Sequence, residues 1–190
     1  PPAIAVPDDA LMVELMSVCL GERVPPEYAG MMREEIGLTS RHVTWSDPAS
    51  KPAPTPHPVV IAGAGASGIA LGANLVKLGI PFVIIEKNAE VGGTWLENRY
   101  PGCGVDTPNH AYSFSHGERY AWSRYFSPRD EIADYMVRSA DAFGVRPHVR
   151  FNSRVVQADW DEARRLWQVR VAGPDGEETI DSIALISAIG

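Results

Sequence analysis

One glycine-rich segment between two apolar runs constrains the fold of this chain more than any other feature. Residues 59–61 form an apolar run too short for a helix, and residues 63–68, GAGASG, follow it almost directly. Residues 69–78 then carry apolar side chains at helical spacing, and Gly79 and Pro81 are typical of a helix end. The segment therefore predicts a strand, a tight turn and a helix.

Each glycine of the turn has a separate mechanical role. Gly63 permits the tight turn, Gly65 lets backbone N–H groups approach a pyrophosphate, and Gly68 lets the helix pack close to the strand. A second strand, residues 82–85, ends at Glu86, a carboxylate that can bind ribose hydroxyls and disfavours a 2′-phosphate. The unit therefore predicts a βαβ fold that binds FAD or NAD rather than NADP; the alternative is a glycine-rich turn without a ligand. The candidate cofactor-binding residues here are Gly63, Gly65, Ser67, Gly68 and Glu86.

Composition and charge exclude several classes of protein. The 190 residues are 45% apolar and 22% charged, as in ordinary globular domains. A net charge of −7 without a Lys/Arg-rich run argues against nucleic-acid binding. Since no run approaches the ~20 apolar residues of a membrane span and the N-terminus lacks signal-peptide regions, we expect a cytoplasmic protein without membrane contact. Cys19 and Cys103 predict free thiols, and the scattered histidines predict no metal site.

Residues 1–46 predict a helical N-terminal arm. Asp8 can cap a first helix that ends at Gly21, and residues 25–26, both proline, can start a second helix that ends at Gly37. The expected apolar faces are Leu11, Met12, Leu15, Met16 and Cys19 on the first helix, and Tyr28, Met31, Met32 and Ile36 on the second. Because two short helices cannot form a core alone, we expect these faces to cover either the rest of the chain or a second copy in a homodimer, with equal weight.

The remainder of the chain predicts a linker and a single larger domain. Residues 47–58 contain five prolines and predict an extended, semi-rigid linker, so the nucleotide-binding domain spans residues 59–190. Ser127 can cap a helix with Pro128 at its first position. The strands expected after it are an antiparallel meander at 149–160, 166–172 and 178–180, and a buried parallel strand at 183–189.

A loop between residues 88 and 127 adds further candidate ligands. Gly92, Gly93, Thr94 and Trp95 follow Glu86 closely, so the chain is expected to turn back over the nucleotide with bare backbone beside it, which suits a flavin. The long turn-rich loop that follows is of a length that is usually functional or disordered.

Together these motifs resemble those of type I Baeyer–Villiger monooxygenases. They are GAGASG at 63–68, Glu86, GGTW at 92–95, RYPG at 99–102 with Asp106, and YSFS at 112–115. The variant RYPGCGVD, the following TPNHAYSFS and the helical arm look most like the 4-hydroxyacetophenone monooxygenase branch. The more common form of this motif is RYPGARCD. This chain has Cys103, Gly104 and Val105 where that form has Ala, Arg and Cys, so no role of that arginine can be transferred.

The resemblance implies roles for individual residues. The backbone of Gly92, Gly93, Thr94 and Trp95 would touch the flavin, Tyr112 would contact FAD, and Gly104 and Val105 would line an NADPH-facing surface. Asp106 resembles the catalytic acid that lies beside the flavin, orients an arginine of a later domain and helps to hold the nicotinamide; the alternative is a loop acid that caps Asn109 or a nearby helix.

Other residues receive weaker assignments. Val155 resembles the position whose backbone binds the adenine, although a core valine explains it equally well. Trp95 and Tyr100 are expected to pack rather than to react, and His110 and His116 are expected in a surface loop.

The sequence thus predicts a doubly wound, Rossmann-like α/β FAD-binding domain of the glutathione-reductase type, with a small antiparallel meander and a helical N-terminal arm. The resemblance implies FAD-dependent oxygenation of ketones, aryl ketones among them, to esters with NADPH and O₂. A second G-x-G-x-x-G and the family's F-x-G-x-x-x-H-x-x-x-W fingerprint do not occur, and both ends look like cuts in a longer polypeptide, so this chain alone is not expected to turn over. The alternatives are a flavin-binding or assembly fragment without catalysis and a flavin-containing N- or S-oxygenase.

Overall fold

The computed structural model describes residues 5–40, 43–51, 53, 55–115, 117 and 120–190. The chain forms two compact units, one up to residue 42 and one from Val43 to Gly190. This boundary lies a few residues before the predicted end of the arm. Trp45 accounts for the difference, because its Nε1–H donates to the carbonyl of Leu78 at 3.1 Å and ties the linker to the larger unit.

The smaller unit is a pair of helices, α1 (Asp9–Leu20) and α2 (Tyr28–Glu35). Asp8 caps α1 as predicted, by accepting a hydrogen bond from the Leu11 N–H at 2.8 Å. The helix α2 begins at Tyr28 rather than at the prolines, which form a turn before it. The core of this unit is small and comprises Met12, Met16, Val24 and Ala29.

The apolar face predicted for α1 is wider than the face that is buried. Leu11 and Leu15 are 46% and 47% exposed, and Cys19 is exposed as well. Within this unit α2 covers the stripe that contains Met12 and Met16, and the prediction that the wider face covers the rest of the chain or a second copy stays a prediction. Leu11 and Leu15 therefore form an apolar surface on α1 that α2 does not cover.

The linker is not uniformly extended where the structure describes it. A short 3₁₀ turn, η1 (Pro48–Ser50), opens it, and the Ala49 N–H donates to Asp47 Oδ1 at 2.9 Å. Pro52 and Pro54, on which part of the prediction rests, lie outside the described residues.

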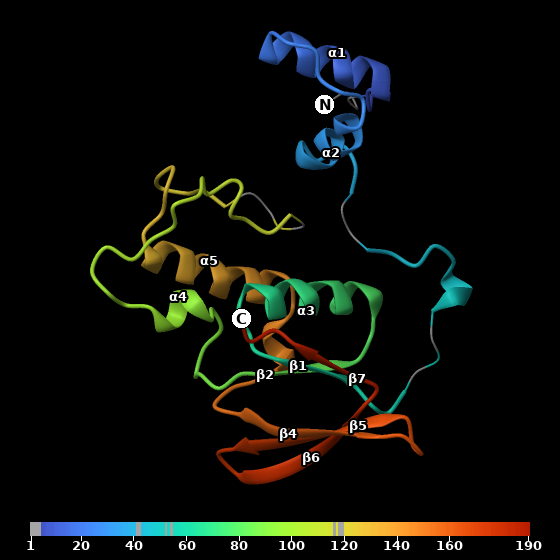
Figure 1. Ribbon diagram of the computed structural model, residues 1–190, viewed down its shortest axis with the longest axis vertical. Helices are drawn as coiled ribbons and strands as arrows, with labels where there is room; N and C mark the ends of the chain where they lie inside the picture. The colour runs from blue at the N-terminus through green and yellow to red at the C-terminus, as the bar shows by residue number, and fades with distance from the viewer. Residues whose placement is uncertain (1–4, 41–42, 52, 54, 116, 118–119) are drawn as a thin grey trace. The chain divides into compact units, whose positions relative to one another are not determined.

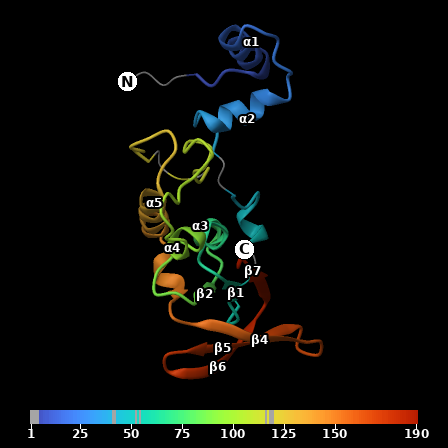
Figure 2. The same ribbon diagram turned by 60° about the vertical axis from the view of Figure 1, so that its left-hand side comes forward.

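The larger unit is built on a four-stranded parallel sheet in the order β3-β2-β1-β7. Its strands are β1 (Val59–Ala62), β2 (Phe82–Ile85), β3 (Val149–Arg150) and β7 (Ala184–Ser187). Figures 1 and 2 show α3 (Ala66–Leu78) and α5 (Arg129–Ala142) on one face, and on the other the antiparallel sheet of β4 (Arg154–Asp161), β5 (Leu166–Gly173) and β6 (Gly176–Ser182). The predicted α/β fold class is confirmed.

Alternation along the strands creates the two cores of this unit. In β1, Ile61 faces the helices and packs in the cluster with Ile69 and Ile132, whereas Val60 belongs to the cluster with Val169 and Val171 of the antiparallel sheet. A strand whose side chains alternate between two buried faces must be apolar throughout, which is why residues 59–61 lack polar positions.

Two expectations about element boundaries were wrong. Residues 149–160 form two strands in different sheets, because the chain turns at Asn152 (φ 52°) between β3 and β4. Ser127 does not cap α5, since Pro128 occupies the cap position and the Ser127 hydroxyl instead donates to Glu131. The last strand, β7, pairs in parallel with β1 as predicted, but it is partly exposed rather than buried.

Candidate functional site

The turn between β1 and α3 has the geometry that its glycines predict. Gly63 has φ +101°, and a Cβ there would lie 2.6 Å from the carbonyl oxygen of Ala188. A Cβ at Gly68 would lie 2.0 Å from the carbonyl oxygen of Gly63, so this glycine permits contact with the turn itself rather than with the strand. Only glycine is compatible with either position.

The N-terminus of α3 presents hydrogen-bond donors that no side chain caps. Its N-cap residue is Gly65, which has no side chain to accept a bond from the first helical N–H groups. These N–H groups, at the positive end of a helix of 13 residues, form a site suited to an anion such as a pyrophosphate.

The segment after Glu86 folds back against this turn, as predicted. Gly92 and Gly93 have φ +130° and +51°, and a Cβ at Gly93 would lie 2.9 Å from the Cα of Gly65. The Gly92 N–H donates to the carbonyl of Ala64 at 3.0 Å. The short helix α4 (Thr94–Glu97) starts there, so two glycine turns face each other backbone to backbone.

Glu86 organises the turn with both of its carboxylate oxygens. It is 3% exposed; Oε2 accepts from the Ala64 N–H at 2.7 Å and Oε1 from the Asn88 N–H at 2.8 Å. Each oxygen has a second lone pair, so the carboxylate can accept two further hydrogen bonds from ribose hydroxyls.

These parts enclose a cavity of about 590 Å³. It is lined by most of the predicted cofactor residues: Gly63, Gly65, Ser67, Glu86, Gly92, Gly93, Thr94, Trp95, Tyr112 and Val155. Gly68 does not line the cavity; it lets α3 lie close to the Gly63 carbonyl of the turn that does. Sequence reasoning missed Lys87, Asn98, Ser153 and Arg154. Ala188 and Ile189, at the end of the last predicted strand, also line the cavity. The position of Lys87 directly after the acid was an available signal, whereas Ser153 and Arg154 depend on where β4 begins.

Two aromatic residues close one side of this cavity. Trp95 is 9% exposed, and its Nε1–H donates to the Tyr112 hydroxyl at 3.0 Å. Their rings meet edge to face at a centroid distance of 5.6 Å. The packing role predicted for Trp95 is confirmed, but that predicted for Tyr100 was wrong, because Tyr100 is 62% exposed.

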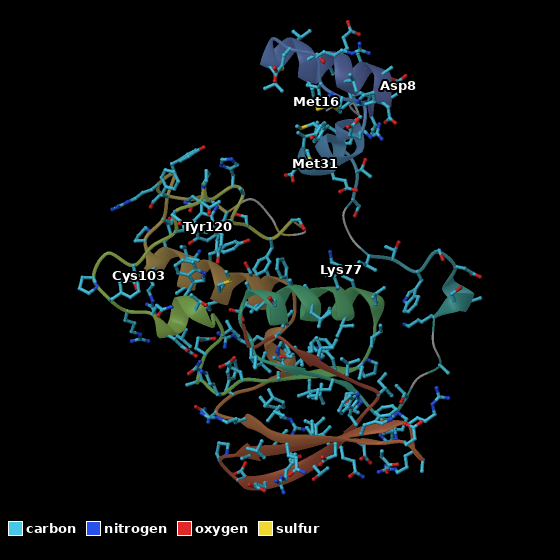
Figure 3. The ribbon with its side chains drawn as sticks, in the orientation of Figure 1. Asp8, Met16, Met31, Lys77, Cys103 and Tyr120 are labelled. Carbon is cyan, nitrogen blue, oxygen red and sulfur yellow. The ribbon has the colours of Figure 1, made fainter. Side chains whose placement is uncertain are left out.

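Asp106 lies in a second cavity, of about 810 Å³, together with Gly104 and Val105. Arg99, Arg124 and Arg129 also line it, and Cys103, labelled in Figure 3, lies on the loop beside α5. The structure therefore does not bring Asp106 into the cavity that holds the glycine turns.

The Asp106 carboxylate does not cap Asn109, which was one of the two alternative roles, the other being the cap of a nearby helix. Asp106 is exposed, and its Oδ1 accepts a long hydrogen bond of 3.4 Å from the Thr107 hydroxyl. The Asn109 N–H donates instead to the carbonyl of Tyr125 at 3.0 Å. His110 is exposed as expected, and His116 lies outside the described residues.

Two structural findings concern other classes of site. Within the described part of the chain, no group of three or more His, Cys, Asp or Glu side chains could hold a metal ion, and Cys19 and Cys103 are both free thiols. None of the described helices is long and apolar enough to cross a membrane.

The residues of the smaller cavity fit a dinucleotide. The cavity combines uncapped helix N–H groups, glycines where a Cβ would fill the cradle, and an acid at the end of the second strand.

Comparisons with known proteins agree with this fit. Residues 61–128 match the family model of an NAD(P)-binding Rossmann-like domain. The uncharacterized monooxygenase y4iD of Sinorhizobium fredii is 37% identical over 180 residues, which are 94% of this chain and 26% of that protein. A Baeyer–Villiger monooxygenase of Streptomyces coelicolor is 38% identical over 70% of this chain and 25% of its own length.

Solved structures give the same result. OTEMO in complex with FAD and NADP has 39% identity and a TM-score of 0.66 over 73% of this chain and 26% of its own. An oxidized steroid monooxygenase bound to NADP has 32% identity and a TM-score of 0.65 over 70% of this chain and 26% of its own. The chain thus spans about a quarter of the length of the relatives it matches.

Proposed function

We propose that this chain is the FAD-binding part of a Baeyer–Villiger monooxygenase, the family that its relatives and structural neighbours support. The complete protein would oxygenate ketones to esters with NADPH and O₂. The observation that carries the proposal is the meeting of the α3 N-terminus, Glu86 and the Gly92–Gly93 turn around one cavity. The finer assignment, to the 4-hydroxyacetophenone branch and to aryl ketones, rests on the RYPGCGVD and TPNHAYSFS motifs.

When bound, FAD would supply the redox chemistry with NADPH and O₂. The residues of this chain would bind and orient it. The N–H groups at the start of α3 would hold the pyrophosphate, and Glu86 would accept hydrogen bonds from the ribose. Gly65 and Gly93 leave room for the backbone to approach the ligand closely. Trp95 and Tyr112 would exclude water from one side of the cavity.

Asp106 would act in the second cavity, as the acid that helps to hold the nicotinamide of NADPH. Its exposure and the neighbouring Gly104 and Val105 are compatible with this role, since a carboxylate at a cavity wall can accept hydrogen bonds from a ligand in that cavity. Most of the NADPH site would be formed by other parts of the complete protein.

The arm and the cysteines bear on partners and location. Leu11, Leu15 and Val18 are 46%, 47% and 76% exposed on one face of α1, which supports a homodimer contact through the arm as one of its two uses. The other use is docking on the same polypeptide.

Two free thiols support a cytoplasmic location.

The test uses the complete polypeptide with bound FAD. Addition of NADPH without oxygen should bleach the flavin absorbance, and aerobic turnover with an aryl methyl ketone should give the ester. If a ketone gives no ester while a thioether is oxidised, the protein is an S-oxygenase instead. The 190-residue chain mixed with FAD and NADPH is the control. Bleaching of the flavin by this chain alone would contradict the proposal that most of the NADPH site lies in other parts of the complete protein.

A further inference from the structure

A buried hydrogen-bond network joins the loop that carries Asp106 to the start of α5. Asn109 is 2% exposed; its Oδ1 accepts from the Ser127 N–H at 3.1 Å. Its Nδ2 donates to the carbonyl of Arg124 at 2.7 Å and to the Ser127 hydroxyl at 2.6 Å. That hydroxyl in turn donates to Glu131 on α5. A buried amide with these three bonds is costly to replace, because its partners would be left unpaired.

The network fixes both ends of a short bulge. At one end the Val105 N–H donates to the Ser127 carbonyl at 3.1 Å, and Gly104 pairs with Pro128 as an antiparallel bridge. At the other end Asn109 bonds to residues 124–127 of the same segment through its backbone and its side chain. Residues 106–108 lie between these two anchors.

Asp106 itself has little to hold it. Its carboxylate accepts the 3.4 Å bond from Thr107, its neighbour on the same bulge, and is otherwise exposed to the second cavity. The position of the carboxylate is therefore set by the backbone anchors rather than by contacts of its own.

We propose that Asn109, acting through Ser127, is a positioning residue that fixes the Asp106 carboxylate in the second cavity for its contact with the nicotinamide cofactor. This inference rests on the proposed function, in which Asp106 faces NADPH. Glu131 completes the anchor on α5, and the Ser127 hydroxyl is the main reason that the pKa of Glu131 lies below its usual value.

Asn109→Ala in the complete, FAD-loaded polypeptide tests the proposal with two readouts. Hydrogen–deuterium exchange of the amides at 105–109 should become about tenfold faster, because the anchors open locally. The Kd for NADP⁺ should rise about tenfold or more at unchanged FAD content, since small misplacements of a positioning group are costly. Asn74→Ala is the matched control: its Nδ2 donates to Ala70 on α3 at 2.9 Å, and it does not line the second cavity.

A double-mutant cycle separates positioning from general destabilisation. In the Asp106→Ala background, Asn109→Ala should no longer change the Kd for NADP⁺ while its effect on amide exchange persists. If Asn109→Ala accumulates poorly, Asn109→Asp replaces it, because the aspartate keeps the acceptor for the Ser127 N–H and loses both donors.

The possible outcomes test the role of Asn109 and the proposed function separately. Unchanged exchange at 105–109, or an equal rise in Kd with and without Asp106, overturns the role of Asn109. Loss of FAD in parallel with NADP⁺ affinity also overturns it, since the defect is then structural. If the wild-type protein is not reduced by NADPH, the proposed function fails, and exchange alone decides whether Asn109 fixes the bulge.

Discussion

Replacement of Gly68 by alanine has an effect whose size follows from the structure. The added Cβ would lie 2.0 Å from the Gly63 carbonyl oxygen, whereas ordinary contacts begin near 3.4 Å, so about 1.4 Å of overlap (3.4 − 2.0) must be relieved. The obstacle is backbone and cannot rotate away, so α3 has to move from the turn. Overpacking costs about 1–3 kcal/mol, and the helix propensity of alanine offsets about 1 kcal/mol. With the clash at the upper end of that range, we expect a net loss of about 2 kcal/mol.

The assay is FAD retention by the complete polypeptide, measured as flavin absorbance per protein after gel filtration, together with the thermal midpoint. If the clash destabilises only the conformation that binds FAD, a loss of about 2 kcal/mol corresponds to roughly 30-fold weaker FAD binding. Gly30→Ala on α2 is the matched control, because no atom lies within 4 Å of its Cβ position apart from its chain neighbours and the backbone of α2 itself. That variant should be stabilised by up to about 1 kcal/mol with its FAD content unchanged. Wild-type FAD affinity in Gly68→Ala would refute the location of the pyrophosphate at this turn.

Three other predictions concern separate parts of the chain. Glu86→Ala should weaken FAD retention more than Glu86→Gln, because glutamine keeps one acceptor oxygen. If both variants retain as much flavin as the wild type, Glu86 does not bind the ribose. Glu131 has a pKa below its usual 4.5, chiefly through the Ser127 hydroxyl, so its stabilisation is present above that value and is lost as the pH falls through the lowered pKa. Unfolding midpoints measured down an acid series should therefore drop less steeply in Glu131→Gln than in the wild type. Deletion of residues 1–46 should either disperse a dimer or only lower the stability of a monomer, and light scattering decides between these uses of the arm.

The nucleotide-binding unit could be predicted from the sequence because its determinants are local. Strand, turn, helix and acid follow one another within residues 59–86, and each requirement is met by a residue next to the element that it serves. The contact between Gly65 and Gly93 was anticipated only as a return of the chain toward the nucleotide. Its closeness depends on backbone angles that the sequence indicates solely through the glycine pair.

Element boundaries were predicted less well where tertiary contacts decide them. The apolar alternation of residues 149–160 does not reveal that the strand changes sheets. Hydrogen bonds from Asn152 N–H to Asn88 and from Ser153 N–H to Glu86 impose the turn, and those partners are far away in the sequence. Likewise, a serine before a proline is typical of a helix cap, yet here the Ser127 side chain has better partners in Asn109 and Glu131.

The two cavities differ in how the chain builds them, and this difference has a consequence for variants. The smaller cavity is formed around the ends of β1 and β2, so its geometry is part of the fold itself. The larger cavity lies between two loop segments outside both sheets, which are joined by backbone hydrogen bonds at Gly104 and Val105 and by the side chains of Asn109 and Ser127. Asp106 could therefore be identified from the sequence only through the resemblance of its motif, and no periodicity pointed to Asn109. It also follows that the loop network can be loosened without disturbing the strands that form the smaller cavity, so retention of FAD and affinity for NADP⁺ should be separable by mutation.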